Sequence, residues 1–181
     1  MESTKTRILK KLLETDGYLS GQELCEQLGV SRTAVWKYMK QLKEEGYEIE
    51  AVQNKGYCLK DVPDVLGESE IKSRLHTRWA GQTLYYYDEI DSTNTQIKRL
   101  AEEDAPHGTL AVADYQSRGK GRRGRAWDSP HGSAIYMSIL FRPEIRPDRA
   151  SMLTLVIGLS VTQAIRSNLG LQAQIKWPND V

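Results

Sequence analysis

The 181-residue chain carries 27% charged and 39% hydrophobic residues and a formal net charge of +1, which is typical of a globular protein of one large or two small domains. No apolar run is long enough to cross a membrane, and the N-terminus lacks the apolar core of a signal peptide. The two cysteines, Cys25 and Cys58, have neither metal-site nor disulfide-framework spacing, so we expect a cytoplasmic protein with inert thiols.

Three short helices are predicted at the N-terminus. The first has apolar residues at helical spacing, namely Ile8, Leu9, Leu12 and Leu13. Ser20 begins the sequence S-G-Q-E, a capping box that predicts the start of a second helix. Ser31 follows the turn Gly29-Val30 and is placed to cap a third helix, whose apolar side carries Val35, Met39 and Leu42. Two strand-like runs, 47–52 and 56–60, follow with a turn between them.

The third helix has a second, positively charged side. Its residues 31–43 include four basic side chains and no acid. A helix-turn-helix followed by a hairpin is typical of a winged helix, in which the third helix enters a DNA major groove. The predicted DNA contacts are Ser31, Arg32, Thr33, Trp36, Lys37, Lys40 and, at the hairpin tip, Lys55. The alternative is that these charges are only the solvated side of a small helical domain.

A soft boundary follows, because 61–64 breaks both patterns. We expect a winged-helix domain at 1–62, a linker at 63–67 and a second domain at 68–181. In that domain the pattern predicts a short helix from Ser69 to about Arg78, strands at 83–90, 109–116, 133–141 and 172–177, and helices at 92–103 and 151–170. Alternating strands and helices predict a sheet covered on at least one face, and the apolar helix 151–170 is expected in the core.

The stretch 118–127, RGKGRRGRAW, combines five basic side chains with three glycines. Guanidinium groups bind phosphate and carboxylate through forked donors, so the loop is suited to a polyanion. It lacks the Walker sequence, and no helix opens at its formal G-x-G-x-x-G. We expect it to be disordered without ligand and ordered with it. The alternative is an arginine-glycine segment that binds RNA or DNA.

Two more segments favour a small-molecule site. The sequence DSTN at 91–94 lies at a strand-to-helix junction, where hydroxyls and free backbone N–H groups converge, although helix capping alone also explains it. The sequence KWPND at 176–180 places a base and an acid four residues apart, which suits a phosphate and its metal ion. A surface turn is the alternative there.

The order DSTN, YQ-x-x-GKGRRGRAW, SP-x-G-x-x-I-Y-x-S and KWPND resembles the biotin protein ligases, and the N-terminal helix-turn-helix resembles their bifunctional class of ligase and biotin-operon repressor. The resemblance covers the whole chain and implies an α+β fold, in which a winged helix precedes part of a class II synthetase-like catalytic domain with a mixed sheet. It implies that biotin and ATP, with Mg²⁺, form biotinyl-5′-adenylate, which then acylates a lysine of a biotin carboxyl carrier domain. It also implies operator DNA as a partner and a homodimer in the adenylate-bound state.

The family motifs imply roles for individual residues. Arg122 and Lys176 would be catalytic. Biotin would contact Ser92, Thr93, Asn94, Gln116, Gly119, Lys120, Gly121 and Arg122. ATP or the adenylate would contact Arg122, Arg125, Trp127, Lys176 and Asn179, and Asp180 would bind the metal.

Two features depart from the family pattern. Lys120 stands where the family usually has Arg, which keeps the charge but loses the forked donor. The family continues beyond the position of Val181 with further strands, a second ligand-contacting lysine and a small β-barrel, so we expect a fragment of a ligase. The alternatives are a regulator that only senses biotin or its adenylate, a nucleic-acid-binding protein that uses the arginine-glycine loop, and a lipoate ligase.

Overall fold

The computed structural model describes residues 3–178 and 180–181, apart from the side chain of Arg122. The chain forms two compact units, residues 1–141 and 142–181. Within the described part, no helix is both long enough and apolar enough to cross a membrane. The domain boundary expected at 63–67 stays a prediction.

The N-terminal part of the first unit is a winged helix-turn-helix, as predicted. Its elements are α1 (Thr4–Glu14), α2 (Gly21–Leu28), α3 (Arg32–Glu44), β1 (Glu48–Val52) and β2 (Gly56–Asp61). The Ser20 hydroxyl accepts a hydrogen bond from Glu23 N at 3.0 Å, and the Ser31 hydroxyl accepts one from Ala34 N at 3.2 Å, so both predicted caps are confirmed. The buried core is shared by the three helices and β1: Ile8, Leu9, Leu12, Leu19, Leu24, Leu28, Val35, Met39, Leu42, Tyr47 and Ile49.

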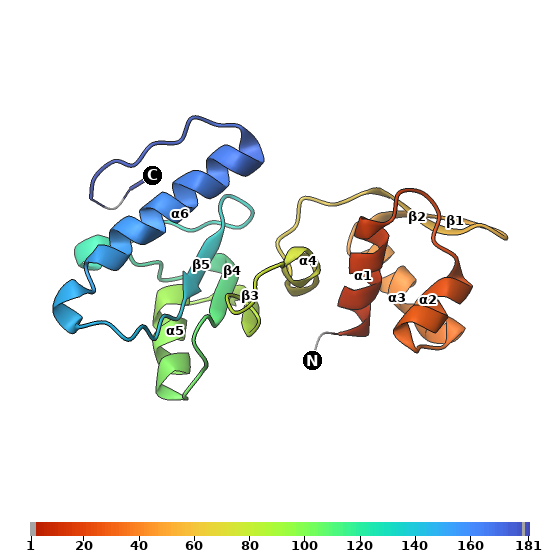
Figure 1. Ribbon diagram of the computed structural model, residues 1–181, viewed down its shortest axis with the longest axis horizontal. Coiled ribbons are helices and arrows are strands. Elements are labelled where there is room, and N and C mark those ends of the chain that lie inside the picture. Colours follow the sequence, from red (N-terminus) through yellow and green to blue (C-terminus); the bar gives the residue numbers. More distant parts are fainter. Residues whose placement is uncertain (1–2, 179) are drawn as a thin grey trace. The chain divides into compact units, whose positions relative to one another are not determined.

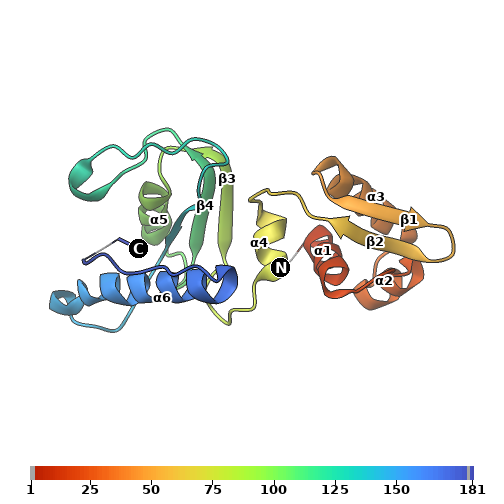
Figure 2. The same ribbon diagram turned by 90° about the horizontal axis from the view of Figure 1, so that it is seen from above.

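The wing is the antiparallel hairpin of β1 and β2, whose turn projects past the helices (Figures 1 and 2). Leu19 pairs with Tyr57 of β2 through two backbone hydrogen bonds of 2.8 and 2.9 Å. This antiparallel bridge joins the loop between α1 and α2 to the wing. Gly56 has φ +108°, and a Cβ there would lie 2.2 Å from Leu19 O. Only glycine permits this close approach, which fixes the wing against the helices.

A mixed three-stranded sheet forms the rest of the first unit. Its elements are α4 (Glu68–Arg74), β3 (Leu84–Ile90), α5 (Thr93–Glu102), β4 (Leu110–Gln116), the 3₁₀ turn η1 (Arg122–Gly124) and β5 (Tyr136–Ile139). The strand order is β3-β4-β5, with β3 parallel and β5 antiparallel to β4. On one face Ala111 packs with Ile97 and Leu100 of α5, and on the other Val112 packs in a cluster with Ile71 of α4. The sheet is therefore covered on both faces, and the predicted α+β class is confirmed.

The second unit contains the 3₁₀ turn η2 (Pro147–Arg149) and the long helix α6 (Met152–Leu169), which ends at Gly170 in the left-handed conformation. Two expectations are wrong here. Most apolar side chains of α6 are exposed, Leu153 and Ile165 are half-buried, and only Thr162 is buried, because within 142–181 the helix has only the extended segment after Gly170 to pack against. Segment 172–177 forms no strand, because no strand of the described chain pairs with it. In the first unit, α4 also ends earlier than expected, at Arg74, where Leu75 turns to extended backbone.

Candidate functional site

The two motifs of the first unit meet at one edge of the sheet. Because β3 and β4 are parallel, their carboxyl ends coincide, and Ile90 pairs with Gln116 in register. The DSTN turn follows Ile90 and the basic loop follows Gln116. Backbone hydrogen bonds of 2.8 Å, from Ser117 N to Ile90 O and from Arg118 N to Asp91 O, join the two segments. The sheet thus brings together residues predicted to act at one ligand, at the position where α/β proteins commonly bind ligands.

Gln116, the last residue of β4, satisfies the first free backbone N–H of α5. Its Oε1 accepts hydrogen bonds from Thr93 N at 2.9 Å and from Thr93 Oγ1 at 3.2 Å, while its Nε2 donates to Ser129 Oγ at 2.9 Å. Since the proton of Thr93 Oγ1 goes to Gln116, the Ser138 hydroxyl 3.0 Å away is the donor in that pair. A strand residue therefore caps the first turn of α5 and fixes the orientation of its own amide.

Ser92 is left without the capping bond. It lies at the N-cap position of α5, but its side chain makes no capping hydrogen bond. The residue is 1% exposed, and its Oγ finds no hydrogen-bond partner anywhere in the described chain. A buried unsatisfied hydroxyl costs about 1–3 kcal/mol, so its retention points to a ligand atom that completes the bond. Helix capping alone does not explain this serine.

Asp91 and Arg99 form a salt bridge beside this turn. Arg99 donates to both carboxylate oxygens, at 3.1 Å through Nη1 and 2.6 Å through Nη2, and Ser92 N donates to Oδ1 at 2.8 Å. The hydrogen bonds from Arg99 are the main reason that the pKa of Asp91 lies below its ordinary value; burial opposes them, and the Ser92 amide and the charges of Arg99 and Lys120 add to the lowering. The carboxylate stays charged and anchors the turn that presents Ser92.

The basic loop is folded as a small hairpin. Trp127 N donates to Gly119 O at 2.9 Å and Gly121 N donates to Arg125 O at 2.8 Å, on either side of the turn 122–124. A Cβ on Gly119 would lie 2.3 Å from Trp127 O, so this glycine is required by the loop's own packing and not only by a ligand. Lys120 and Arg125 are exposed, and the Trp127 side chain is 62% exposed. The Arg122 side chain lies outside the described part, and disorder of the ligand-free loop stays a prediction.

The KWPND motif lies in the second unit as a tight turn. Lys176 and Asp180 exchange two backbone hydrogen bonds, of 2.9 and 3.1 Å, and both residues are exposed. Asn179 lies outside the described residues. Among the residues that are described, no three His, Cys, Asp or Glu side chains gather as a metal site. Asp180 could therefore supply one carboxylate to a metal ion whose other ligands come from elsewhere.

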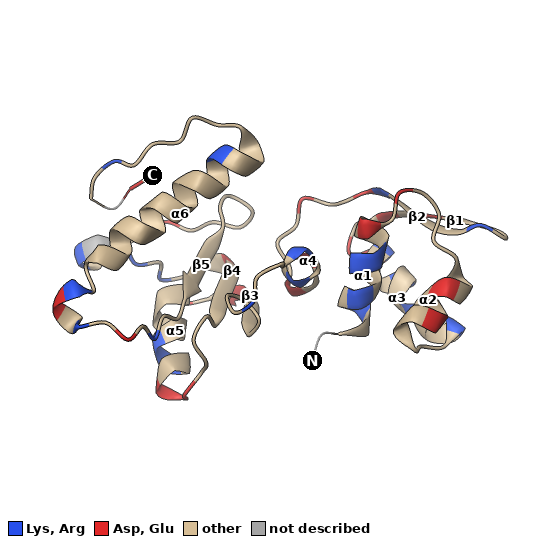
Figure 3. Cartoon of the chain, viewed as in Figure 1, with Lys and Arg blue, Asp and Glu red and all other residues tan. Residues whose placement is uncertain are grey.

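The predicted DNA-binding side chains share the exposed side of α3 and the wing. Ser31, Arg32, Thr33, Trp36, Lys37, Lys40 and Lys55 are all exposed, and the Trp36 side chain is 61% exposed. Figure 3 shows basic residues along α1 and at the turn of the hairpin, whereas α2 carries acidic ones. Lys40 Nζ lies 3.7 Å from Glu44 Oε1, and the Ser31 hydroxyl already accepts the capping hydrogen bond from Ala34 N. Their contacts with DNA stay predictions.

Sequence reasoning missed three contributors to the ligand site. Ser129 and Ser138 complete the hydrogen bonding around Gln116 and Thr93, and Arg99 holds Asp91. A serine within the apolar strand YMSI was a usable signal for Ser138. Ser129 and Ser138 are the first and last residues of the motif SP-x-G-x-x-I-Y-x-S, but the sequence analysis assigned no role to either; Ser129 is 1% exposed, and its Oγ accepts from Gln116 Nε2.

Residues 86–181, more than half of the chain, match the model of the Biotin/lipoate A/B protein ligase family. The chain belongs to this family. Residues 4–58 of this ligase-family chain match a second model, described as an HTH domain. The resemblance to biotin protein ligases inferred from the motifs is thereby confirmed.

Curated relatives of the ligase-family chain include the bifunctional ligase/repressor BirA of Bacillus spizizenii, which is 46% identical and is matched over 100% of this chain and 56% of its own length. The protein of the same name from Escherichia coli is 36% identical over 94% of this chain and 51% of its own. A solved biotin protein ligase from Aquifex aeolicus, in complex with biotin and ATP, is 39% identical over 54% of this chain and 40% of that chain, with a TM-score of 0.47. The chain thus spans about half the length of the two BirA relatives.

Proposed function

We propose that the chain belongs to a bifunctional biotin protein ligase and repressor. It would activate biotin with ATP, transfer it to a lysine of a biotin carboxyl carrier domain, and repress transcription from an operator when the adenylate is bound. Family membership and the relatives named as ligase/repressor support this proposal. The observation that carries it for the site itself is the buried, unpartnered hydroxyl of Ser92 beside the basic loop.

The ureido group of biotin offers both N–H donors and a carbonyl acceptor. The Ser92 hydroxyl can donate and accept, so one bond from it to the ureido group would remove the cost of its burial. Thr93 and Gln116 would form the adjoining wall, and their mutual bonds would keep that wall rigid before biotin arrives. Asn94, exposed on the first turn of α5, would complete this end of the site.

The activation step needs no nucleophile from the protein. A carboxylate oxygen of biotin attacks the α-phosphorus of ATP, the bond to the bridging oxygen breaks, and pyrophosphate leaves with that oxygen. The protein's task is to hold two anions together and to stabilise the charge that develops. Gly119, Lys120, Gly121 and Arg122 would close over the phosphate, Arg125 and Trp127 would bind the nucleotide, and Lys176 and Asn179 would bind phosphate. Arg122 and Lys176 would carry the largest share of charge stabilisation.

Mg²⁺ would enter with the nucleotide. Asp180 is a single carboxylate, and among the described residues no set of three ligands surrounds it. Mg²⁺ commonly takes one or two carboxylates together with substrate phosphates and waters, so this chain fits the ion only when ATP supplies the other ligands. When bound, the ion would neutralise phosphate charge.

The winged helix would serve the repressor function. The exposed basic side of α3 and the wing support an electrostatic contact with duplex DNA. We expect the adenylate-bound protein to pair as a homodimer, so that two winged helices meet two half-sites. Sedimentation of the protein with and without biotin and ATP tests this pairing.

The deciding experiment is biotin-dependent exchange of labelled pyrophosphate into ATP, by this chain and by a version extended to the length of its relatives, together with calorimetric titration of biotin into both. Exchange in both proteins supports the ligase and shows that residues 1–181 suffice for activation. Exchange only in the longer protein, with biotin binding in both, makes the 181-residue chain a sensor. Neither exchange nor biotin binding in either protein contradicts the proposal.

A further inference from the structure

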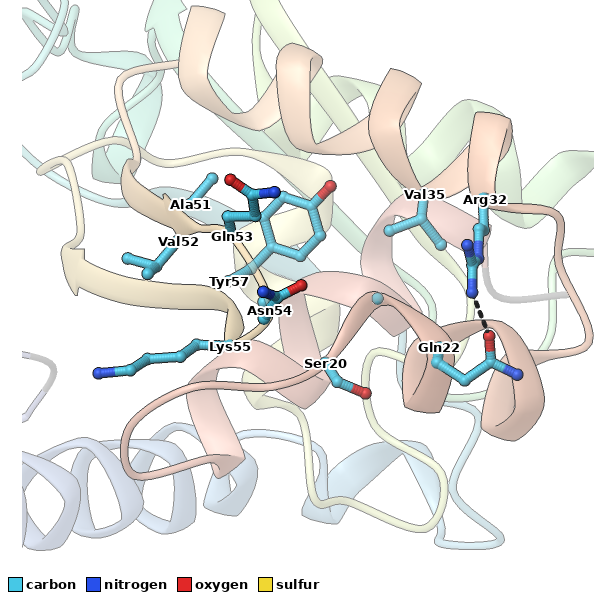
Figure 4. A pocket seen from close by; sticks show the side chains of 12 residues that line it. Ser20, Gln22, Arg32, Val35, Ala51, Val52, Gln53, Asn54, Lys55 and Tyr57 are labelled. Carbon is cyan, nitrogen blue, oxygen red and sulfur yellow. Dashed lines mark hydrogen bonds between the residues drawn. The ribbon is translucent and has the colours of Figure 1, made fainter.

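A cleft lies between the turn of the wing and the first turns of α2 and α3, and Figure 4 shows it from close by. Its volume is about 470 Å³. The described residues that line it include the side chains of Gln22, Arg32, Gln53, Asn54, Lys55 and Tyr57, and none of those residues is acidic. A cleft with cationic and amide donors and no carboxylate suits an anion.

Arg32 is the cation that faces this cleft from the helices. It is the first residue of α3, and its side chain is exposed. Its guanidinium uses one nitrogen, Nη2, in a hydrogen bond of 2.6 Å to Gln22 Oε1, drawn as the dashed line in Figure 4. The remaining N–H groups of the fork make no other hydrogen bond to the described residues, and the side chain is exposed. They provide the forked donors that match a phosphate.

Gln22 in turn is held by Glu26. Gln22 Nε2 donates to Glu26 Oε1 at 2.7 Å, one helical turn away on α2. Because a carboxylate only accepts, the amide nitrogen must face Glu26, and the amide oxygen must face Arg32. The two hydrogen bonds, from Gln22 to Glu26 and from Arg32 to Gln22, therefore fix which end of the Gln22 amide faces the guanidinium. They also restrict the rotation of the long, exposed Arg32 side chain.

Lys55 takes no part in these hydrogen bonds between Glu26, Gln22 and Arg32. Its ammonium lies 5.5 Å from the centre of the Tyr18 ring, and Figure 4 shows it pointing away from Arg32. The Tyr18 hydroxyl donates to Glu50 at 2.7 Å, which holds the ring in place. Lys55 also lines the cleft, but its side chain is directed away from Arg32, so the two residues are separate cationic contacts.

We propose that the cleft between the wing and the starts of α2 and α3 receives a backbone phosphate of duplex DNA, with Arg32 as the anion ligand and Gln22 as the residue that positions Arg32. This inference rests on the proposed DNA binding by the winged helix. A prepositioned guanidinium loses less side-chain entropy when it binds, so loss of Gln22 weakens binding although its own charge is zero.

A phosphate contact does not depend on base sequence, so a fluorescein-labelled duplex of arbitrary sequence is a suitable probe. Its affinity for the 181-residue protein is measured by fluorescence anisotropy across a salt series. Arg32→Ala is expected to weaken binding about tenfold and to lower the slope of log K against log salt by about one. Gln22→Leu is expected to weaken binding by roughly threefold to tenfold at low salt, and to add nothing in the Arg32→Ala background.

Gln27 provides a matched control on the same helix. It makes the same kind of bond, from Nε2 to Glu23 Oε1 at 2.9 Å, but no bond from it to an arginine occurs in the described part of the chain. Gln27→Leu is therefore expected to leave both the affinity and the salt slope unchanged, and circular dichroism melts show whether each variant is folded.

Three results overturn the inference in distinguishable ways. If the unmodified protein does not bind the duplex at low salt, the proposed DNA binding fails and the cleft site fails with it. If the protein binds but Gln22→Leu behaves like Gln27→Leu, DNA binding stands and the positioning role of Gln22 is wrong. If Arg32→Ala leaves the salt slope unchanged, the cleft is not a phosphate site.

Discussion

The side-chain oxygen of Gln116, on the last residue of β4, accepts a hydrogen bond from the backbone N–H of Thr93 at 2.9 Å and so caps α5 from the neighbouring strand. Ser92, at the N-cap of the same helix, makes no capping bond, and its buried Oγ has no hydrogen-bond partner among the described residues. We therefore expect this hydroxyl to be the group that meets a ligand.

Ser92→Ala is expected to separate stability from ligand binding. Removal of a buried, unsatisfied hydroxyl leaves the ligand-free protein equally stable or more stable, by up to about 1 kcal/mol in urea unfolding. The same change is expected to weaken biotin binding at least about tenfold, measured by calorimetry. Ser73→Ala, which removes a buried hydroxyl that donates to Glu70 O at 2.9 Å, is the control and leaves biotin binding unchanged. Unaltered affinity in Ser92→Ala would show that the hydroxyl does not meet the ligand.

Gln116→Leu is expected to destabilise the protein by roughly 1–3 kcal/mol, because Thr93 N loses its acceptor and Ser129 loses its donor. Gln116→Glu keeps an acceptor for Thr93 and loses only the bond to Ser129, whose hydroxyl still donates to Trp127 O at 3.2 Å, so its cost is smaller. Urea unfolding of both variants tests this order. Equal losses would mean that the cap across the strands contributes little to stability.

Gly119→Ala and Gly121→Ala form a matched pair within the basic loop. A Cβ at Gly119 would lie 2.3 Å from Trp127 O, whereas one at Gly121 would lie 3.4 Å from Arg125 O. The first substitution must displace backbone and is expected to cost more than about 2 kcal/mol, while the second costs less than about 1 kcal/mol. Susceptibility of the loop to trypsin is expected to rise only in Gly119→Ala. The reverse order would show that the hairpin is not the folded form of the loop.

The Asp91–Arg99 pair predicts a pH dependence with a definite sign. Arg99 holds the pKa of Asp91 below its ordinary value. The ionised carboxylate therefore adds to the free energy of unfolding at pH values above the ordinary pKa, and this contribution is lost as the pH falls through the lowered pKa. In Arg99→Gln the pKa of Asp91 is expected to rise towards the ordinary value, which carboxyl NMR titration measures. Added salt should reduce the shift because the pair is largely exposed. An unmoved pKa in Arg99→Gln would show that the salt bridge is absent in solution.

Interactions close in sequence were predictable. Ser20 and Ser31 each meet a backbone N–H three residues ahead, so the capping box and the turn at Gly29 were sufficient to place α2 and α3. The alternation of strands and helices predicted β3, α5, β4 and β5, since hydrophobic periodicity depends on the chain's own geometry. The resemblance also assigned the motifs 91–94 and 118–127 to one ligand site, and that assignment stays a prediction.

Contacts between distant residues were decided only by the tertiary structure. Gln116 is 23 positions from Thr93, and Ser138 is 45 positions from it, so no local pattern could predict that these two strand residues hydrogen-bond to Thr93. The exposure of α6 was unpredictable for a similar reason. An apolar pattern predicts that a helix can be buried, but it does not identify the surface that covers the helix. The sequence by itself determined which elements form and which chemistry they carry, since caps, turns and periodicity act over a few residues. The pairing of β3 with β4 decided which polar groups satisfy one another, and it left the buried Ser92 hydroxyl without a partner among the described residues, because buried hydrogen bonds depend on neighbours in space.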